Sequence, residues 1–191
     1  MDSSHGYEAI SQAFVRGRSR DIGVREVNRW AKALRRGCSV LDLGCGCGLP
    51  LTAILVNEGF ETFGIDASPS LVELFQRNLP GVPIRCEAVE TSHFFERSFD
   101  AVLAWGLMFL LSAHAQRNLL TRISGVLVPK GRLLFTAPRE PAVWSDAMTG
   151  LPSISLGQEE YGRQLACSGL SIREQYEDES GNHYFDVVKL S

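Results

Sequence analysis

The chain has 191 residues, of which 45% are hydrophobic and 21% charged, and its formal net charge is −3. This balance is ordinary for one globular domain, and a weakly acidic chain is a poor partner for nucleic acid. No apolar run of the sequence approaches the ~20 residues that cross a bilayer, and the first residues lack the pattern of a signal peptide. We therefore expect a cytoplasmic protein with no membrane or nucleic-acid partner, and the sequence predicts no oligomeric state.

Two amphipathic helices are predicted at the start of the chain, over residues 7–16 and 21–36, from apolar residues at helical spacing. Asp21 is the expected N-cap of the second helix, and Gly37 is expected just beyond its end. Residues 1–37 carry eight Arg and Lys against four Asp and Glu, a net charge of +4. Two interpretations stay open, namely a surface that receives an anionic substrate and an ordinary solvated helix face.

A glycine-rich loop follows the first predicted strand. The apolar run 40–43 predicts a buried strand, which ends in Gly44, Gly46 and Gly48 before a helix over residues 49–57. Glycines permit positive φ and leave no Cβ between the backbone and a ligand. The arrangement predicts a strand-loop-helix crevice of a doubly wound α/β sheet, with the ligand beyond the carboxyl end of the strand.

Two aspartates indicate which ligand the crevice takes. Asp66 ends the next predicted strand, 20 residues after Gly46, where an acid can accept both hydroxyls of a ribose. Leu49 stands where a dinucleotide site has its third glycine, and Asp42 would repel a pyrophosphate while suiting a cation. S-adenosylmethionine carries a sulfonium and an ammonium and no phosphate, so it fits this site.

The cysteines do not predict a metal site. Five are present, an odd number without the spacing of a disulfide framework. Cys45 and Cys47 lie inside the glycine loop and lack the second pair that a zinc site requires. We interpret them as small residues that let the backbone approach a ligand.

The rest of the chain alternates strands and helices. Helices are expected over residues 68–78, 113–126 and 158–168, with Ser68 as an N-cap, and strands over 84–86, 99–105, 132–136, 170–176 and 183–190. A short polar segment, residues 178–182, joins the last two strands. Residues 107–111 are apolar enough to be core or pocket wall. Residues 138–156 show no period and are expected to be irregular.

Four motifs in this order resemble the class I S-adenosylmethionine-dependent methyltransferases, of the small bacterial type 11/12-like kind. They are residues 40–48, 64–68, 99–102 and 127–134, and the resemblance covers roughly residues 38–136. It implies a Rossmann-like fold with helices on both faces of a mostly parallel, seven-stranded sheet of order 3-2-1-4-5-7-6, whose last strand is antiparallel. The chain is then one domain, with a helical cap (1–37), a cofactor-binding core (38–136), and a substrate rim with the last helix and terminal hairpin (137–191).

The resemblance also implies which residues bind the cofactor. Around the glycine loop and ribose they are Asp42, Gly44, Cys45, Gly46, Gly48, Asp66, Ala67 and Ser68. Near adenine they are Glu87, Ala88 and Val89, and beside the methionine part Ala104, Trp105 and Gly106. Glu87 departs from the shorter aspartate usual in the family, so backbone contacts at Ala88 and Val89 are an alternative way to hold adenine.

Four residues are candidates for binding the methyl acceptor. Tyr7 and Phe14 are implied by the family's leading helix, Trp144 lies in a segment that leaves the carboxyl end of a strand, and His183 follows a turn at the same edge. Plain packing is the alternative for Tyr7, Phe14 and His183. The predicted acceptor is a small, partly apolar molecule.

The predicted activity is methyl transfer by in-line displacement, in which the protein aligns the reactants and excludes water. No motif identifies a general base, so we name no catalytic residue. Two alternatives are a protein that binds S-adenosylmethionine without turnover, as a sensor or partner subunit, and a nicotinamide oxidoreductase.

Overall fold

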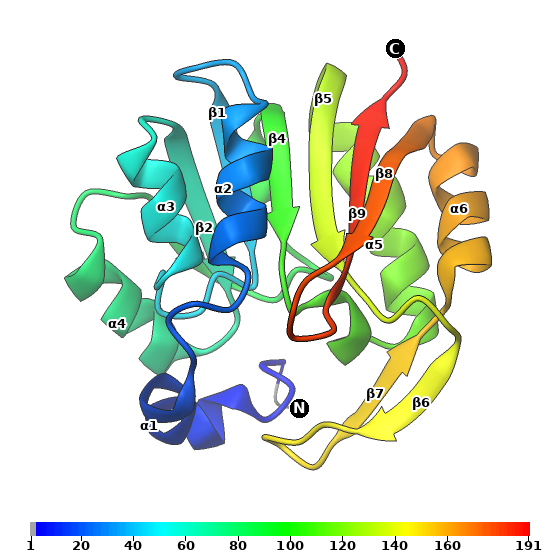
Figure 1. The fold of residues 1–191 in the computed structure, drawn as a ribbon. Helices are drawn as coiled ribbons and strands as arrows, with labels where there is room; N and C mark the ends of the chain where they lie inside the picture. The colour runs from blue at the N-terminus through cyan, green and yellow to red at the C-terminus, as the bar shows by residue number, and fades with distance from the viewer. Residues whose placement is uncertain (1–2) are drawn as a thin grey trace.

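A seven-stranded sheet forms the centre of the molecule (Figure 1). The computed structural model describes residues 3–191. The strands are β1 (Ser39–Leu43), β2 (Glu61–Asp66), β3 (Ile84–Cys86), β4 (Phe99–Ala104), β5 (Leu127–Thr136), β8 (Leu170–Glu177) and β9 (His183–Lys189). Their order is β3-β2-β1-β4-β5-β9-β8, with β9 antiparallel to both of its neighbours. This is the predicted topology, because the two additional strands, β6 and β7, form a separate sheet.

Helices cover both faces of the sheet, as predicted. α2 (Val24–Lys32) and α3 (Leu51–Asn57) pack on one face, and α5 (Ala113–Val126) and α6 (Gln158–Cys167) on the other (Figure 1). Successive strand residues point to opposite faces. Leu133 and Phe135 therefore join the core under α5 and α6, while Leu134 joins the core under α2 and α3. Because both faces are buried, the central strands are largely apolar.

α4 (Pro69–Asn78) packs beside β2 and β3 and begins as predicted, with Ser68 as its N-cap and Pro69 in its first turn. The Ser68 hydroxyl accepts a hydrogen bond from the Leu71 N–H at 3.2 Å. Phe75 is fully buried, and a Cβ added to Gly48 would lie 2.9 Å from its ring. The third glycine of the loop therefore makes room for α4.

Three segments lie at the carboxyl edge of the parallel strands (Figure 1). α1 (Tyr7–Gly17) crosses this edge and contacts α4. A small hairpin of β6 (Ala142–Ser145) and β7 (Pro152–Ser155) lies beside it, and the turn between β8 and β9 reaches the same edge. Together they enclose the space beyond the ends of β1 and β4.

The structure corrects several local predictions. Residues 138–156 are not irregular, because β6 and β7 pair through main-chain hydrogen bonds that need no apolar period. α2 begins after Gly23 rather than Asp21, since Gly23 takes a positive φ of 78° that closes the preceding turn. Gly37 lies in the turn before β1, beyond the end of α2 at Lys32.

The two leading helices do not act together as a cap. α1 lies over the carboxyl edge, whereas α2 packs on the face of the sheet because Val27, Trp30 and Ala31 form one buried apolar stripe. In the part of the chain that the structure describes, no helix is long and apolar enough to cross a membrane.

Candidate functional site

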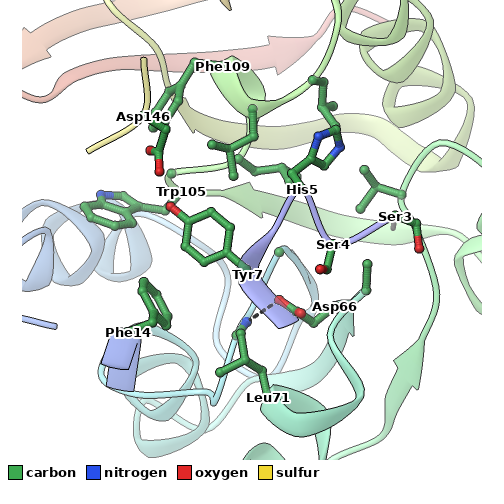
Figure 2. Close-up of a pocket in the computed structure, with 18 of the residues that line it drawn as sticks. Ser3, Ser4, His5, Tyr7, Phe14, Asp66, Leu71, Trp105, Phe109 and Asp146 are labelled. Carbon is green, nitrogen blue, oxygen red and sulfur yellow. Dashed lines mark hydrogen bonds between the residues drawn. The ribbon is translucent and has the colours of Figure 1, made fainter. Parts of the chain in front are cut away.

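A cavity of about 190 Å³ opens at the carboxyl edge of the sheet (Figure 2). Its walls come from residues 3–18, the glycine loop, the end of β2, the segment after β4, the β6–β7 turn and the turn before β9. Residues 107–111, expected to be core or pocket wall, are both, because Met108 is buried in the core while its neighbours line the cavity. The cavity lies where a doubly wound sheet binds its ligand.

Two of the three loop glycines line the cavity. Gly44 and Gly46 have φ values of 67° and 57°, and a Cβ at Gly46 would project toward the cavity, 3.7 Å from the ring of Phe14. Gly48 and Cys45 face the protein interior instead. A Cβ at Gly64 would lie 2.8 Å from the Cys45 sulfur, so the small residues there serve close packing.

Asp66 lies at the cavity floor and is fixed by two main-chain groups. Its Oδ2 accepts a hydrogen bond from the Gly46 N–H at 2.8 Å (dashed in Figure 2), and its Oδ1 accepts one from the Ser68 N–H at 2.9 Å. Burial raises the pKa of this carboxyl, and the two N–H donors oppose the rise. Ala67 lines the cavity beside it.

Ser68 is fully buried and does not reach the cavity. Its hydroxyl donates to the Glu8 carboxylate of α1 at 2.5 Å, and the hydroxyl and N–H of Ser70 donate to the same carboxylate at 2.6 and 3.1 Å. Ser68 therefore joins α1 to α4.

Asp42 lies behind the glycine loop rather than in the cavity wall. It is 4% exposed, and its Oδ2 accepts a hydrogen bond from the Thr52 hydroxyl at 2.7 Å. Burial raises its pKa to about 7, while the hydrogen bond from Thr52 and the positive charge of Arg18 oppose the rise. A carboxylate in this position can affect a molecule in the cavity only through its electric field and not through contact.

The segment after β3 supplies the wall nearest the N-terminal residues. Val89 and Glu90 line the cavity, whereas Glu87 and Ala88 do not. Glu90 is 3.4 Å from the Nε2 of His5, which also lines it. Within residues 3–191 no hydrogen bond reaches the buried Oε1 of Glu87, and the nearest cation is the Arg85 guanidinium at 3.8 Å.

Aromatic residues dominate the opposite wall. Tyr7 and Phe14 line the cavity with ring centroids 5.1 Å apart, and Trp105 and Gly106 line it at the end of β4. Ala104 is buried in the core. The Trp105 Nε1 donates to the hydroxyl of Tyr184 at 2.9 Å, which fixes the plane of the indole ring.

Trp144 and His183 are not among the lining residues. Trp144 packs against Phe109, which lines the cavity, with ring centroids 5.6 Å apart. His183 is 8% exposed, its Nε2 is 3.0 Å from the Gln175 Oε1, and burial lowers its pKa. The strand alternation turns His183 inward, and its neighbour Asn182 reaches the cavity instead.

A comparison of the sequence with protein families identifies the fold's family. Residues 40–131 match the family model described as a methyltransferase domain. These residues, just under half of the chain, form its methyltransferase domain. The matched residues of the methyltransferase domain run from β1 to β5 and include the glycine loop and Asp66.

Known relatives of the methyltransferase domain act on different acceptors. The ubiquinone biosynthesis O-methyltransferase of Azorhizobium caulinodans is 28% identical over 155 residues, 78% of this chain and 58% of that protein. The ribosomal protein L11 methyltransferase of Thermus thermophilus is 33% identical over 127 residues, 63% of this chain and 47% of that protein. The chain thus spans about half the length of the curated relatives it matches.

A solved structure supports the fold over the whole chain. The CcbJ methyltransferase of Streptomyces caelestis superposes with a TM-score of 0.81 and covers 100% of both chains at 15% identity. At this identity the similarity concerns the fold of the methyltransferase domain and not its chemistry.

Sequence reasoning missed three charged residues of the cavity wall, namely Arg18, Glu90 and Asp146. The Arg18 guanidinium lies 5.1 Å from the ring of Phe14 and 5.3 Å from that of Trp105. It forms no ion pair with a carboxylate of residues 3–191, and burial lowers its pKa. The basic composition of residues 1–37 was the available sign, but it does not distinguish Arg18 from its neighbours.

Proposed function

We propose that this chain transfers a methyl group from S-adenosylmethionine to a small-molecule acceptor. The observation that carries the proposal is the pairing of Gly46 with Asp66, in which a glycine without a Cβ and a buried carboxylate face one cavity. An acid in this position is suited to ribose hydroxyls. The relatives named above are methyltransferases, which supports the same activity.

Three further features of the cavity suit the parts of this cofactor. Gly44 and Gly46 leave room for the ligand against the backbone. The Arg18 guanidinium is a cation without a carboxylate partner in residues 3–191, so it would hold the carboxylate of the methionine part. Val89 lines the cavity in the segment where adenine would lie, so its main chain would contact the adenine ring, whereas Glu87 lies outside the cavity wall.

The protein's part in the reaction is to position the acceptor and exclude water. S-adenosylmethionine supplies a methyl group that its sulfonium already activates. The rings of Tyr7, Phe14, Trp105 and Phe109 surround the acceptor end of the cavity and keep it largely apolar. A cavity of about 190 Å³ walled by these side chains favours a small, partly apolar acceptor over a nucleic acid.

Calorimetry against S-adenosylhomocysteine and NADH tests the cofactor. We expect S-adenosylhomocysteine to bind and NADH not to bind, and the reverse result would overturn the proposal in favour of an oxidoreductase. Labelled-methyl transfer into a collection of small metabolites then tests turnover. Binding without transfer to any acceptor would favour the sensor or partner-subunit alternative.

A further inference from the structure

Asp146 is a carboxylate held in place over the cavity by its own turn. It lies at the end of β6, where its Oδ1 accepts hydrogen bonds from the Met148 N–H at 3.0 Å, the Thr149 N–H at 2.7 Å and the Thr149 hydroxyl at 2.9 Å. Its main-chain carbonyl also accepts from the Gly150 N–H at 2.8 Å. Three bonds therefore fix the orientation of the side chain, and the fourth holds its main chain in the turn.

The carboxylate turns toward the cavity and faces the hydroxyl of Tyr7 (Figure 2). Burial and the nearby Asp146 charge raise the pKa of Tyr7 to about 12, so the phenol stays protonated and can donate to Asp146. No ion pair joins Asp146 to an Arg, Lys or His of residues 3–191. A fixed negative charge without a cationic partner therefore stands at the acceptor end of the site.

The walls around Asp146 suit a positive charge. The aromatic residues Tyr7, Phe14, Trp105 and Phe109 line the same cavity. The faces of such rings attract cations, and the Arg18 guanidinium already lies over two of them. In the proposed function the Arg18 guanidinium binds the carboxylate of the cofactor. The Asp146 carboxylate takes no part in that contact and can bind the acceptor.

From these features we infer that the acceptor is an amine, anchored as its ammonium form by the Asp146 carboxylate inside the aromatic wall. The inference rests on the proposed function and names its substrate class. A carboxylate acceptor would be repelled by Asp146. An alcohol or phenol would bind without the charge-assisted hydrogen bond that an ammonium donates.

The chemistry balances with the residues present. The ammonium passes one proton to Asp146, which releases it to water, and the nitrogen then carries a free electron pair. Transfer forms the nitrogen–carbon bond and breaks the sulfur–carbon bond, whose electron pair stays on sulfur. The Tyr7 hydroxyl, which donates to Asp146, keeps the carboxylate in the orientation that receives the proton.

The test uses trios of probes in which an amine, an alcohol and a carboxylate share one skeleton, built on benzyl, phenethyl and cyclohexylmethyl groups. Binding is measured by ligand-observed NMR and calorimetry with the protein saturated with S-adenosylhomocysteine. We expect the amine of at least one trio to bind about tenfold or more tightly than its alcohol, and to accept labelled methyl groups.

Two variants separate charge from fold. Asp146→Asn keeps an Oδ1 that accepts the three bonds of the turn, so it removes the charge without removing the hairpin. We expect it to lose the amine preference while its affinity for S-adenosylhomocysteine stays within threefold. Glu179→Gln makes the same charge change at an acid that is 92% exposed at this edge and outside the cavity wall, and should leave the preference unchanged.

The outcomes distinguish the two proposals. If S-adenosylhomocysteine binds but no amine is preferred, or if Asp146→Asn keeps the preference, the amine acceptor is wrong and the proposed function stands. If S-adenosylhomocysteine itself does not bind, the proposed function is wrong, and the inference of an amine acceptor is then wrong as well.

Discussion

The two ends of the cavity are built in different ways. At the cofactor end, Gly44, Gly46 and Asp66 lie directly at the ends of β1 and β2, and two main-chain N–H groups bond the carboxylate. At the acceptor end, the wall includes the side chains of Tyr7 and Asp146, which come from α1 and the β6–β7 turn. These two residues lie outside the seven-stranded sheet.

Because the two ends are built differently, amino-acid substitutions at each end should have different effects on folding and on binding. The backbone of the glycine loop is continuous with the central strands, so altering it disturbs both the ligand site and the sheet. The hairpin pairs only with itself, because β6 and β7 form their own two-stranded sheet. Substitutions at the acceptor end should therefore change which molecule is methylated while leaving cofactor binding and folding largely intact.

The largest effect is expected from Gly46→Val. The residue has a φ of 57°, which costs a branched side chain about 1–2 kcal/mol, and the new methyl groups would enter the cavity. We expect calorimetry to detect no binding of S-adenosylhomocysteine, together with a lower melting temperature. Gly37→Val is the matched control, since it has a φ of 68° with nothing within 4 Å of an added Cβ. Normal binding by Gly46→Val would mean that the ligand lies elsewhere.

A smaller loss is expected from Asp66→Ala, which removes the acceptor for two ribose hydroxyls, each charge-assisted bond contributing about 1.5–3 kcal/mol. Affinity for S-adenosylhomocysteine should fall at least tenfold in a folded protein. Asp100→Ala is the control, because Asp100 bonds Ser39 at the opposite ends of β4 and β1 and should not affect affinity. Unchanged affinity in Asp66→Ala would remove Asp66 from the site.

Trp144→Ala tests the acceptor end alone. Trp144 supports Phe109 from behind, so its loss should raise the acceptor KM several-fold while affinity for S-adenosylhomocysteine stays within a few-fold. Steady-state kinetics with the amine found above would measure it. Val143→Ala, at a neighbouring residue that is 74% exposed, should change neither quantity. A loss of cofactor affinity in Trp144→Ala would show that the two ends are not independent.

The smallest effect is a pH dependence at the cofactor end. Burial raises the pKa of Asp42 to about 7, so the carboxyl is mostly neutral below pH 7 and charged above it. A cationic ligand is favoured by the charged form, and affinity for S-adenosylmethionine should rise a few-fold as pH increases through 7. Asp42→Asn should make this dependence flat. An identical pH profile in the variant would assign the dependence to another group.

The raised pKa of Asp42 also makes the free energy of unfolding depend on pH. Because the folded state keeps the Asp42 proton to a higher pH than the unfolded state, its contribution to the free energy of unfolding falls as pH rises from about 4 to about 7, and is then constant. Chemical denaturation of the ligand-free protein across this range would show wild type losing stability relative to Asp42→Asn.

The cofactor end could be predicted from sequence because its parts lie within one strand-helix-strand unit. The spacing from Gly46 to Asp66 is set by α3 and β2, and the structure brings the two residues to 2.8 Å. Gly48 was assigned to the same site because its residue type fits, but its missing Cβ serves α4. A sequence motif predicts that position 48 requires a glycine. It does not show whether the ligand or α4 occupies the space of the missing side chain.

The acceptor end could be predicted only in outline. Tyr7 and Phe14 were identified from a resemblance, and the edge on which residues 138–156 lie followed from topology. Asp146 fixes its turn with the same hydrogen bonds as any aspartate at such a position, so no local pattern shows that its carboxylate also faces a cavity. That fact depends on how the hairpin docks against α1, which is a tertiary contact.

Residues 5–8 are held in place on two sides of the cavity. Glu8 bonds Ser68 and Ser70 on one side, and His5 contacts Glu90 on the other. A molecule bound beneath residues 5–8 would exchange with solvent more readily when these contacts open. The residence time of the bound molecule would then depend on how often these contacts break, as well as on the molecule's own contacts. Residues 5–8 would thus affect the rate of turnover, whereas Gly46 and Asp66 are proposed to determine which cofactor binds.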